Sequence, residues 1–374
     1  MSKPLVNFLL AGIGLFLLCS GCLDPTQPTF RTEEGFYLVE GSIVFGGETT
    51  IRVRTSDFED ALLDFLPVTE ATVVLTGPDD TRIPCLLTVP ELGVYAPNED
   101  FAPQPGEEYA VEVTFPDGNQ AVSLAEEIPP RVVPTNLEIG FSREAFFDEG
   151  RDRFLPAHEP FLSYDDPADQ TNYYAYDFTF WERTLICATC PQGLYRNGAC
   201  TPPGNAFAIP TYDYLCDTEE CYRVQRGRQT IYATDELTDG LAVNGLRLGH
   251  IELDEYGGLL VEGELRSITR AGYAYGRVLQ DLTTGNGGLN ATTPAALVGN
   301  VSNVSPTGRE VLGFVGAVSR GAVRAFVERG EELGDLSRVP RRVVLEPDGP
   351  ISPAPRATCD EPGRTSVRPA GWGG

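Results

Sequence analysis

The feature that most constrains the fold of this chain is a succession of short strand-like runs separated by turns. In Thr49–Ser56, two aliphatic side chains alternate with two arginines, which is the period-two pattern of a half-buried strand. Glu108–Phe115 alternates in the same way and leads into an Asp-Gly turn at Pro116–Asn119, a strong signal for a β-hairpin. The 40 glycines and 30 prolines recur between runs of this kind. The pattern predicts an all-β fold that begins with a small β-sandwich.

The turn residues also predict how the chain is divided. The proline-rich stretch Ile128–Asn136 marks a boundary between a β-sandwich at 36–130 and a larger β-rich second domain at 131–374. In the second domain, Arg270–Thr284 has Tyr273 and Gln280 at helical spacing, so we expect one or two short helices among the strands. No fixed-period repeat is present, which argues against a solenoid or a propeller.

One strand of the second domain, Asn172–Glu182, is rich in aromatic residues. Its alternation places four rings on one face: Tyr174, Tyr176, Phe178 and Phe180. Packing of these rings into a core is the favoured interpretation, because aromatic side chains dominate core packing. The alternative is an exposed aromatic shelf for a ligand.

The first residues read as an export signal. Lys3 precedes an apolar run at Leu5–Leu18, and two small residues then precede Cys22. The run is too short for a permanent helix across a bilayer of about 30 Å. It resembles the lipobox of bacterial lipoproteins, with cleavage after Gly21 and acylation of Cys22, although Cys19 stands where that pattern prefers Leu. Residues 1–21 are therefore expected to be a lipoprotein signal peptide and 22–35 a lipid-anchored tether, the alternative being an ordinary secretory signal.

The charge of the chain excludes some partners. The formal net charge is −26, and the acidic residues are scattered along the chain. A chain this acidic repels nucleic acid and anionic lipid surfaces, so neither is expected as a direct partner. The scatter favours a role in solubility over a specific cation site.

Cysteines carry the strongest local signal of the second domain. Cys22 is the expected lipidation site, and a cysteine-rich insertion runs from 187 to 221. Outside the cytoplasm disulfides are the default, and each could add about 2–4 kcal/mol of stability. The disulfide candidates are Cys187, Cys190, Cys200, Cys216, Cys221 and Cys359. Six cysteines allow 15 connectivities, so no pairs are assigned, and Cys85 is left as a buried free thiol.

A structural zinc site is the alternative use of these cysteines. Cys187, Cys190, Cys216 and Cys221 form two close pairs, a spacing that zinc permits. A redox-active Cys-x-x-Cys motif is a further alternative, but it lacks the βαβ context of thioredoxin-like folds.

Motifs for catalysis, cofactors or metals are not found in the sequence. There is no HExxH, GxSxG, Walker loop or GxGxxG after a strand, so we expect a non-catalytic protein with no cofactor and no metal site. His158 and His250 are far apart in sequence and are interpreted as lone structural or surface residues. Acidic pairs such as Asp165–Asp166 are interpreted as turn residues, although a glycosidase-like carboxylate pair stays open.

Several segments resemble a family of lipoproteins known as domain-of-unknown-function family 4249, typical of Bacteroidota. They are "GCLDP", "LVEGSIVF" and "PGEEYAVEVTFPDG" in the first part, then "NYYAYDFTFWE", "GYAYGRVLQDL", "LVGNVSNVSPTGREVLGFVGAVS" and "RPAGW". The block Gly299–Phe314 is the most specific of them. The resemblance implies an outer-membrane lipoprotein with an N-terminal immunoglobulin-like β-sandwich, encoded near TonB-dependent receptors, and it brings no catalytic motif. Members often have a pair of cysteines near the C-terminus, where this chain has only Cys359.

These observations lead to one favoured function and two alternatives. We expect a non-catalytic cell-envelope lipoprotein, held in the outer membrane through its lipid anchor and exposed on the cell surface, with the periplasmic face still open. Its expected partner is a TonB-dependent transporter, contacted through the Cys187–Cys221 insertion. The alternatives are a stand-alone surface glycan- or ligand-binding lipoprotein and an extracellular hydrolase.

Overall fold

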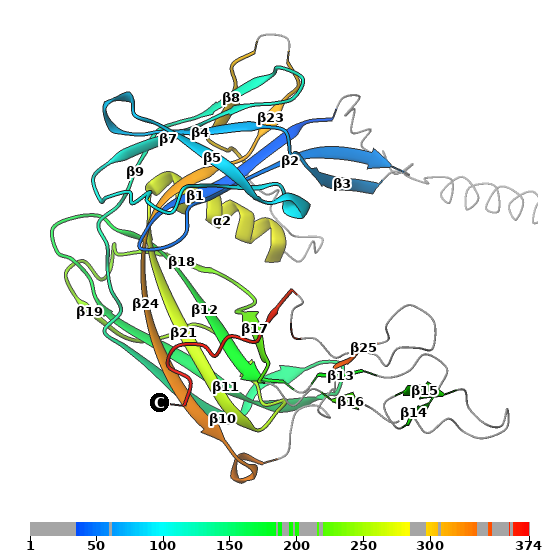
Figure 1. The fold of residues 1–374 in the computed structure, drawn as a ribbon. Coiled ribbons are helices and arrows are strands. Elements are labelled where there is room, and N and C mark those ends of the chain that lie inside the picture. The colour runs from blue at the N-terminus through cyan, green and yellow to red at the C-terminus, as the bar shows by residue number, and fades with distance from the viewer. Residues whose placement is uncertain are drawn as a thin grey trace, which may run out of the picture. The chain divides into compact units, whose positions relative to one another are not determined.

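The first third of the chain forms antiparallel strands, as the alternating runs predict (Figure 1). A computed structural model describes residues 35–59, 62–184, 186–188, 194–196, 199–201, 215–216, 220–284, 297–305, 308–334, 343–345, 359 and 362–373. The predicted signal peptide and the predicted lipidation site Cys22 lie outside these residues. The early strands are β1 (Tyr37–Phe45), β2 (Thr50–Glu59), β3 (Leu62–Pro67), β4 (Thr72–Thr76), β5 (Arg82–Val89), β6 (Val94–Pro97), β7 (Glu108–Thr114), β8 (Gln120–Ser123) and β9 (Glu126–Glu127).

The predicted Asp-Gly hairpin is present between β7 and β8. Gly118 has φ +84°, a conformation that glycine adopts without the steric cost a Cβ would add. The Asn119 amide donates to Asp117 Oδ1 at 2.9 Å, which fixes the turn. Side-chain alternation on β7 then places Tyr109, Val111 and Val113 in a core.

This first core is completed by strands from far along the chain. Its centre holds Val39, Ile51 and Leu75, each at most 1% exposed. β22 (Val301–Asn303) pairs with β8, and β23 (Val311–Leu312) pairs in parallel with β1. The first residues of β24 (Val315–Arg329) also pair in parallel with β1. One sheet of 17 strands therefore includes strands from both predicted domains, and residues 36–374 form one compact unit.

A second core lies between two sheets of the second half. The strands β12 (Tyr173–Arg183), β21 (Gly257–Ile268) and β24 pair side by side and antiparallel, and β17 (Tyr222–Arg226) and β18 (Ile231–Thr234) extend them beyond β12. Facing them is a four-stranded sheet of β10 (Asn136–Asp148), β11 (Arg153–Asp165), β19 (Ala242–Arg247) and β20 (Ile251–Glu252). Tyr174, Tyr176 and Leu265 are at most 2% exposed in the core between these layers.

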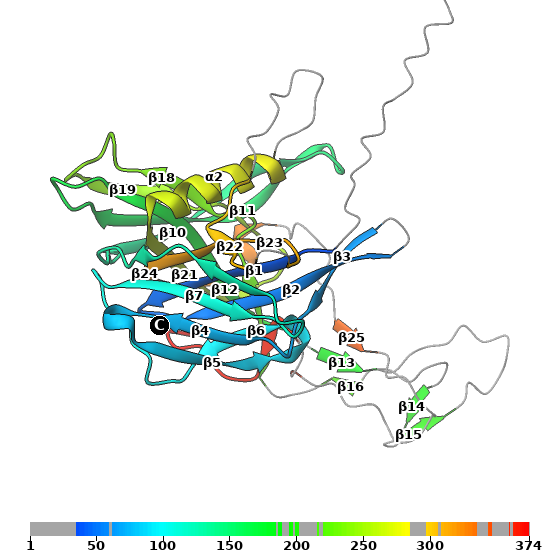
Figure 2. The same ribbon diagram turned by 90° about the horizontal axis from the view of Figure 1, so that it is seen from above.

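The helix predicted at Arg270–Thr284 is confirmed with the same bounds, as α2. The Gly272 amide donates to Thr269 Oγ1 at 3.0 Å, so Thr269 caps the first turn. The side chains at helical spacing contact the rest of the protein: Tyr273 meets Tyr173 at 5.3 Å between ring centroids, and Gln280 donates to the Thr230 carbonyl at 3.2 Å. Gly276 lies so close to Tyr232 that a Cβ would approach that ring to 2.3 Å. The helix lies against β12, β18 and β24 (Figures 1 and 2).

Short strands occupy the described parts of the cysteine-rich insertion and the C-terminal region. They are β13 (Ile186–Ala188), β14 (Leu194–Arg196), β15 (Ala199–Thr201), β16 (Leu215–Cys216), β25 (Val343–Leu345) and β26 (Arg364–Thr365). Single 3₁₀ turns lie at Pro78–Asp80, Pro90–Leu92 and Glu331–Leu333. The fold is all-β with one α-helix among the described residues, in agreement with the sequence prediction. No helix among these residues has the length and apolar character needed to cross a membrane.

Candidate functional site

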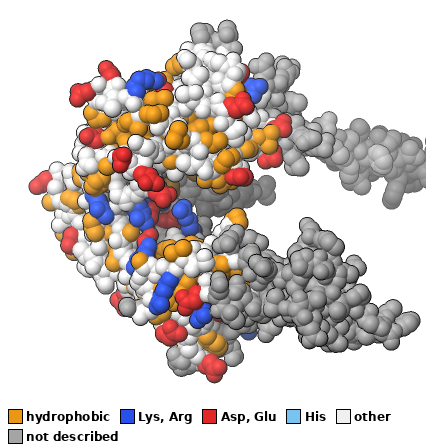
Figure 3. Space-filling view, viewed as in Figure 1, with side chains coloured by type: hydrophobic (Ala, Val, Ile, Leu, Met, Phe, Trp, Pro, Cys, Tyr) orange, Lys and Arg blue, Asp and Glu red, His pale blue; other side chains and the backbone are white. Residues whose placement is uncertain are grey.

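A polar groove of about 560 Å³ lies between the β1–β2 hairpin and one face of the β17–β12–β21–β24 layer. In Figure 3, arginine and acidic side chains gather where this surface is hollowed. The floor of the groove includes Asp177, Thr179 and Trp181 from β12, Val224 and Arg226 from β17, Glu262, Glu264 and Arg266 from β21, and Val318 and Arg320 from β24. The opposite wall is formed by Ser42, Val44, Gly47, Glu48 and Thr50.

Strand register explains why these side chains meet. Side chains of a strand alternate between the two faces of its sheet, so alternate residues of β12 and β21 point into the second core and the others line the groove. Thr179 lies opposite both Glu262 and Arg226, and Glu262 lies opposite Arg324. The floor is therefore a row of cross-strand polar pairs.

Arg320 and Arg324 hold the carboxylates of β21. Arg320 donates to both Glu262 and Glu264, and Arg324 Nε donates to Glu262 Oε2 at 2.6 Å. Arg266 Nε lies 3.3 Å from Glu264 Oε1. Both carboxylates thus have guanidinium partners on both oxygens.

Asp177 is the most weakly paired acid of the floor. Burial raises the pKa of Asp177, and the nearby Glu264 carboxylate adds to this increase. The backbone amide of Phe178, which donates to Asp177 Oδ1 at 2.8 Å, and the Arg266 guanidinium oppose the increase. The distance from Arg266 Nη2 to Asp177 Oδ2 is 3.8 Å, which is long for a hydrogen bond.

The aromatic strand packs mainly into the core, as its favoured interpretation predicted. Tyr174, Tyr176, Phe178 and Phe180 are all at most 9% exposed, so they form no exposed shelf. Trp181, on the other face, is half-buried at the groove, with the Arg324 guanidinium carbon 5.2 Å from its ring centroid. The alternative, an exposed shelf built from the Tyr and Trp residues of Asn172–Glu182, therefore loses Tyr174 and Tyr176, while Tyr173 and Trp181 are half-buried.

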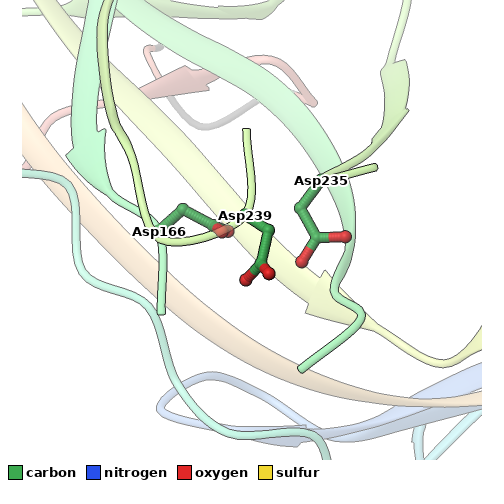
Figure 4. A group of neighbouring side chains, drawn as sticks. All are labelled: Asp166, Asp235 and Asp239. Carbon is green, nitrogen blue, oxygen red and sulfur yellow. The ribbon is translucent and has the colours of Figure 1, made fainter. Parts of the chain in front are cut away.

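A group of three carboxylates lies at the opposite end of β12, in the loops after β11 and β18 (Figure 4). Asp166 and Asp235 are buried and Asp239 is exposed, and one oxygen of each lies within 4.8 Å of the others. Tyr174 donates its hydroxyl proton to Asp166, and the Asn172 amide donates to Asp235 at 2.7 Å. Three converging carboxylates could hold a hard cation such as Ca²⁺. Asp166 was interpreted from the sequence only as a turn residue beside a proline, because Asp235 and Asp239 are distant in the chain.

The two histidines lie near each other in the fold, with His158 in β11 and His250 directly before β20, although they are distant in sequence. His158 in β11 is the register partner of Ile251, next to His250. His158 is 2% exposed, and burial, followed by the charge of Arg329, lowers the pKa of His158 to about 4. His250 stacks on Phe146 at 4.2 Å between ring centroids and borders two smaller pockets of about 190 and 390 Å³.

The structure contains a disulfide between two cysteines whose side chains are described. It joins Cys221 to Cys359, two of the six candidates. Because Cys221 is oxidised, the zinc set that included it is not formed. Cys187 and Cys216 are backbone register partners, while Cys190 lies outside the described residues. Cys85 is a buried free cysteine, as predicted, and burial raises the pKa of its thiol to about 12.

The disulfide fixes a C-terminal segment against the same sheet face that lines the groove. β26 in this segment pairs with β17, and Trp372 packs between Tyr222 and Phe326 at 4.7 and 5.4 Å between ring centroids. Arg324 Nη1 donates to the Ala370 carbonyl at 2.7 Å. The segment at 362–373 therefore covers the apolar end of this face, and the groove occupies its charged end.

Sequence reasoning did not identify the groove. The signal was present, since Glu262, Glu264 and Arg266 alternate on one strand and Arg320 and Arg324 lie four apart on another. Such alternation is typical of a strand face that points to solvent. Only the pairing of β21 with β24 shows that these charged side chains lie next to one another.

Comparisons with known proteins give one match. The model of the family described as "Domain of unknown function (DUF4249)" matches residues 24–324. Searches of curated proteins and of solved structures give no match.

Proposed function

Since the chain belongs to the family described as "Domain of unknown function (DUF4249)", we propose that it is a non-catalytic lipoprotein that captures a ligand beside an outer-membrane transporter. In this proposal Cys22 carries the lipid, and residues 23–35 tether the folded part to the membrane. A TonB-dependent transporter is the proposed partner, on the strength of the family resemblance.

The observation that carries the proposal is the groove. Its volume of about 560 Å³ lies in the range of small-molecule sites, which is about 300–1,000 Å³. Its floor is built on four paired strands, and sites on strands are held more precisely than sites on loops. Its polar lining is already arranged by cross-strand ion pairs, so binding needs little reorganisation.

The chemistry of the lining supports binding without catalysis. The described lining residues include neither histidine nor cysteine, which are common nucleophiles and bases. Glu262 and Glu264 are each held by two arginines, which opposes their use as proton carriers. Arginine beside a carboxylate stabilises its ionised form.

A hydrolase is the second candidate function, and one observation favours it. Asp177 and Glu264 are register partners at the groove, and the raised pKa of Asp177 is a property of general acids. Glycosidases use such carboxylate pairs. Product analysis with polysaccharide substrates decides between the two candidate functions. If the wild-type protein cleaves a polysaccharide and Asp177→Asn abolishes the cleavage, the protein is a hydrolase and the capture function is wrong.

Co-purification tests the proposed partner. The full-length protein is tagged at its C-terminus, expressed in its native cells and extracted in mild detergent. We expect an outer-membrane barrel protein to be enriched with it, as identified by mass spectrometry. Recovery of the lipoprotein without any enriched barrel protein contradicts the proposed partnership.

A matched pair of cysteine variants tests the anchor. Cys22→Ser is expected to move the protein from the membrane fraction to the soluble fraction and to remove the acyl mass. Cys85→Ser is the control, because Cys85 is a buried thiol in β5 and plays no part in anchoring. If Cys22→Ser stays with the membranes as firmly as the control does, lipid anchoring at this residue is wrong.

A further inference from the structure

The two central strands of the groove floor, β12 and β21, offer a ligand only side chains. β12 is hydrogen-bonded to β21 along one edge and to β17 and β18 along the other. β21 lies between β12 and β24, so its backbone groups are also paired on both sides. An extended peptide binds most readily by adding a strand to a free edge, and these strands have no free edge over the groove.

The arginines of the floor have N–H groups to spare. Arg320 uses Nε and Nη2 on the two glutamates, which leaves Nη1 without a hydrogen-bond partner among the described residues. Arg226 is exposed at the groove and makes no ion pair within 4.0 Å to any described residue. A guanidinium group donates five N–H groups and accepts none, so the unfilled requirement of the groove is for oxygen acceptors.

The charges of the groove are balanced, which argues against an ionic ligand. The acids are Glu48, Asp177, Glu262 and Glu264, and the arginines on or beside the floor are Arg226, Arg266, Arg320 and Arg324. A cation would have to displace arginines from Glu262 and Glu264. An anion would approach a chain of net charge −26, which repels it at long range.

We propose that the groove binds a short uncharged oligosaccharide, an inference that rests on the proposed ligand-capturing function and gives its ligand a chemical class. Sugar hydroxyls accept hydrogen bonds from the spare N–H groups of Arg226 and Arg320. They also donate hydrogen bonds to the weakly paired Asp177 carboxylate, which an uncharged acceptor without a donor of its own, such as an ether, cannot do. The half-buried Trp181 supplies an apolar surface beside these polar groups, as amphipathic ligands require.

Retention on immobilised glycans tests the ligand class. The probes are neutral oligomers of glucose, galactose, mannose and xylose, with an acidic oligogalacturonate and an uncharged peptide as comparisons. We expect the wild-type protein to bind at least one neutral oligomer and to bind neither comparison probe more tightly. Failure to retain any neutral oligomer overturns the proposal, and so does a preference for the acidic oligomer or for the peptide.

Two groove variants and one control locate the binding. Arg226→Gln removes an exposed donor that makes no described ion pair, and Ser42→Leu narrows the opposite wall; titration calorimetry is expected to show about tenfold weaker binding for each. Arg82→Gln removes an exposed arginine of β5 that pairs with Glu112 and does not line the groove, so its affinity should equal that of the wild type. Unchanged affinity in both groove variants places the sugar elsewhere and overturns the proposal.

Failure of this inference and failure of the proposed function give different results. If the groove binds no neutral sugar but the barrel protein still co-purifies, the ligand class is wrong and the partnership stands. If a sugar binds in the groove and no barrel protein co-purifies, the ligand class stands and the partnership is wrong.

Discussion

Both faces of the β12–β21–β24 layer carry glutamate–arginine ion pairs, but the pairs on the two faces are buried to different degrees. On the core face, Glu182 and Arg329 form an ion pair at 2.7 Å with each side chain 1% exposed. On the groove face, Glu262 pairs with Arg320 while the two side chains are 12% and 29% exposed. A buried pair must stay intact because either charge alone is costly to bury, whereas a partly exposed pair can be broken at a lower cost in stability. The comparison teaches that burial, and not residue type, separates a structural ion pair from one that is free to meet a ligand.

Breaking the buried pair should give the largest effect. Glu182→Gln leaves Arg329 buried without its carboxylate partner, so we expect a loss of about 3–5 kcal/mol in unfolding free energy, measured by urea denaturation. Arg329→Met should cost less, because Glu182 keeps Arg223 as a partner. If Arg329→Met loses more unfolding free energy than Glu182→Gln, Arg223 does not balance the Glu182 charge once Arg329 is removed.

Releasing the C-terminal segment tests the covered end of the groove face. Cys359→Ala removes the disulfide to Cys221, which closes a sequence separation of 138 residues, and a loss of about 2–4 kcal/mol is expected. The fluorescence of Trp372 should also shift to the red as its contacts with Tyr222 and Phe326 weaken. Cys85→Ala serves as the control for removing a cysteine outside the disulfide, and equal losses in both variants would show that the disulfide contributes nothing specific.

His158 makes the stability of the folded protein sensitive to acid. The pKa of His158 is about 4 in the folded protein and about 6.5 in the unfolded chain, so protonation favours unfolding. This contribution to stability is complete above pH 6.5 and is lost as the pH falls towards 4, by up to about 3 kcal/mol. His158→Phe should remove that part of the pH dependence, as measured by unfolding free energies at a series of pH values. An unchanged slope in the variant would mean that His158 does not titrate in this way.

The smallest effect is expected on the groove face. Glu262→Gln removes the partner of Arg320 and Arg324, but these side chains are partly solvated, so a loss of no more than about 1 kcal/mol is expected from thermal denaturation. A loss as large as that of Glu182→Gln would show that the two faces do not differ in the way proposed.

The local elements followed from the sequence because their signals are local. Alternation predicted β7, and the helical spacing of Tyr273 and Gln280 predicted α2 with its bounds. The hairpin of β10 and β11, which closes the second core, was not predicted. Its strands are long and less regularly alternating, with a register shift between Ser142 and Phe146, so no period marked it.

The sequence predicted less of the candidate site than of the fold. The groove joins β1 to β12, β17, β21 and β24, and Asp177 and Arg320 are distant in sequence. A charged side chain on a strand is usually solvated, so its type and spacing give no sign of a shared site. The carboxylate group of Asp166, Asp235 and Asp239 escaped detection for the same reason.

By itself, the sequence determined the all-β class, the helix, the Asp-Gly hairpin and the burial of the aromatic strand. These follow from the period of side chains along the backbone and from turn residues, which act over a few positions. Only the tertiary structure decided that β24 pairs with both β1 and β21, that Cys221 joins Cys359, and that the charges of β21 face a groove. Such contacts depend on which distant segments pack together, and that choice is made by burial over the whole chain.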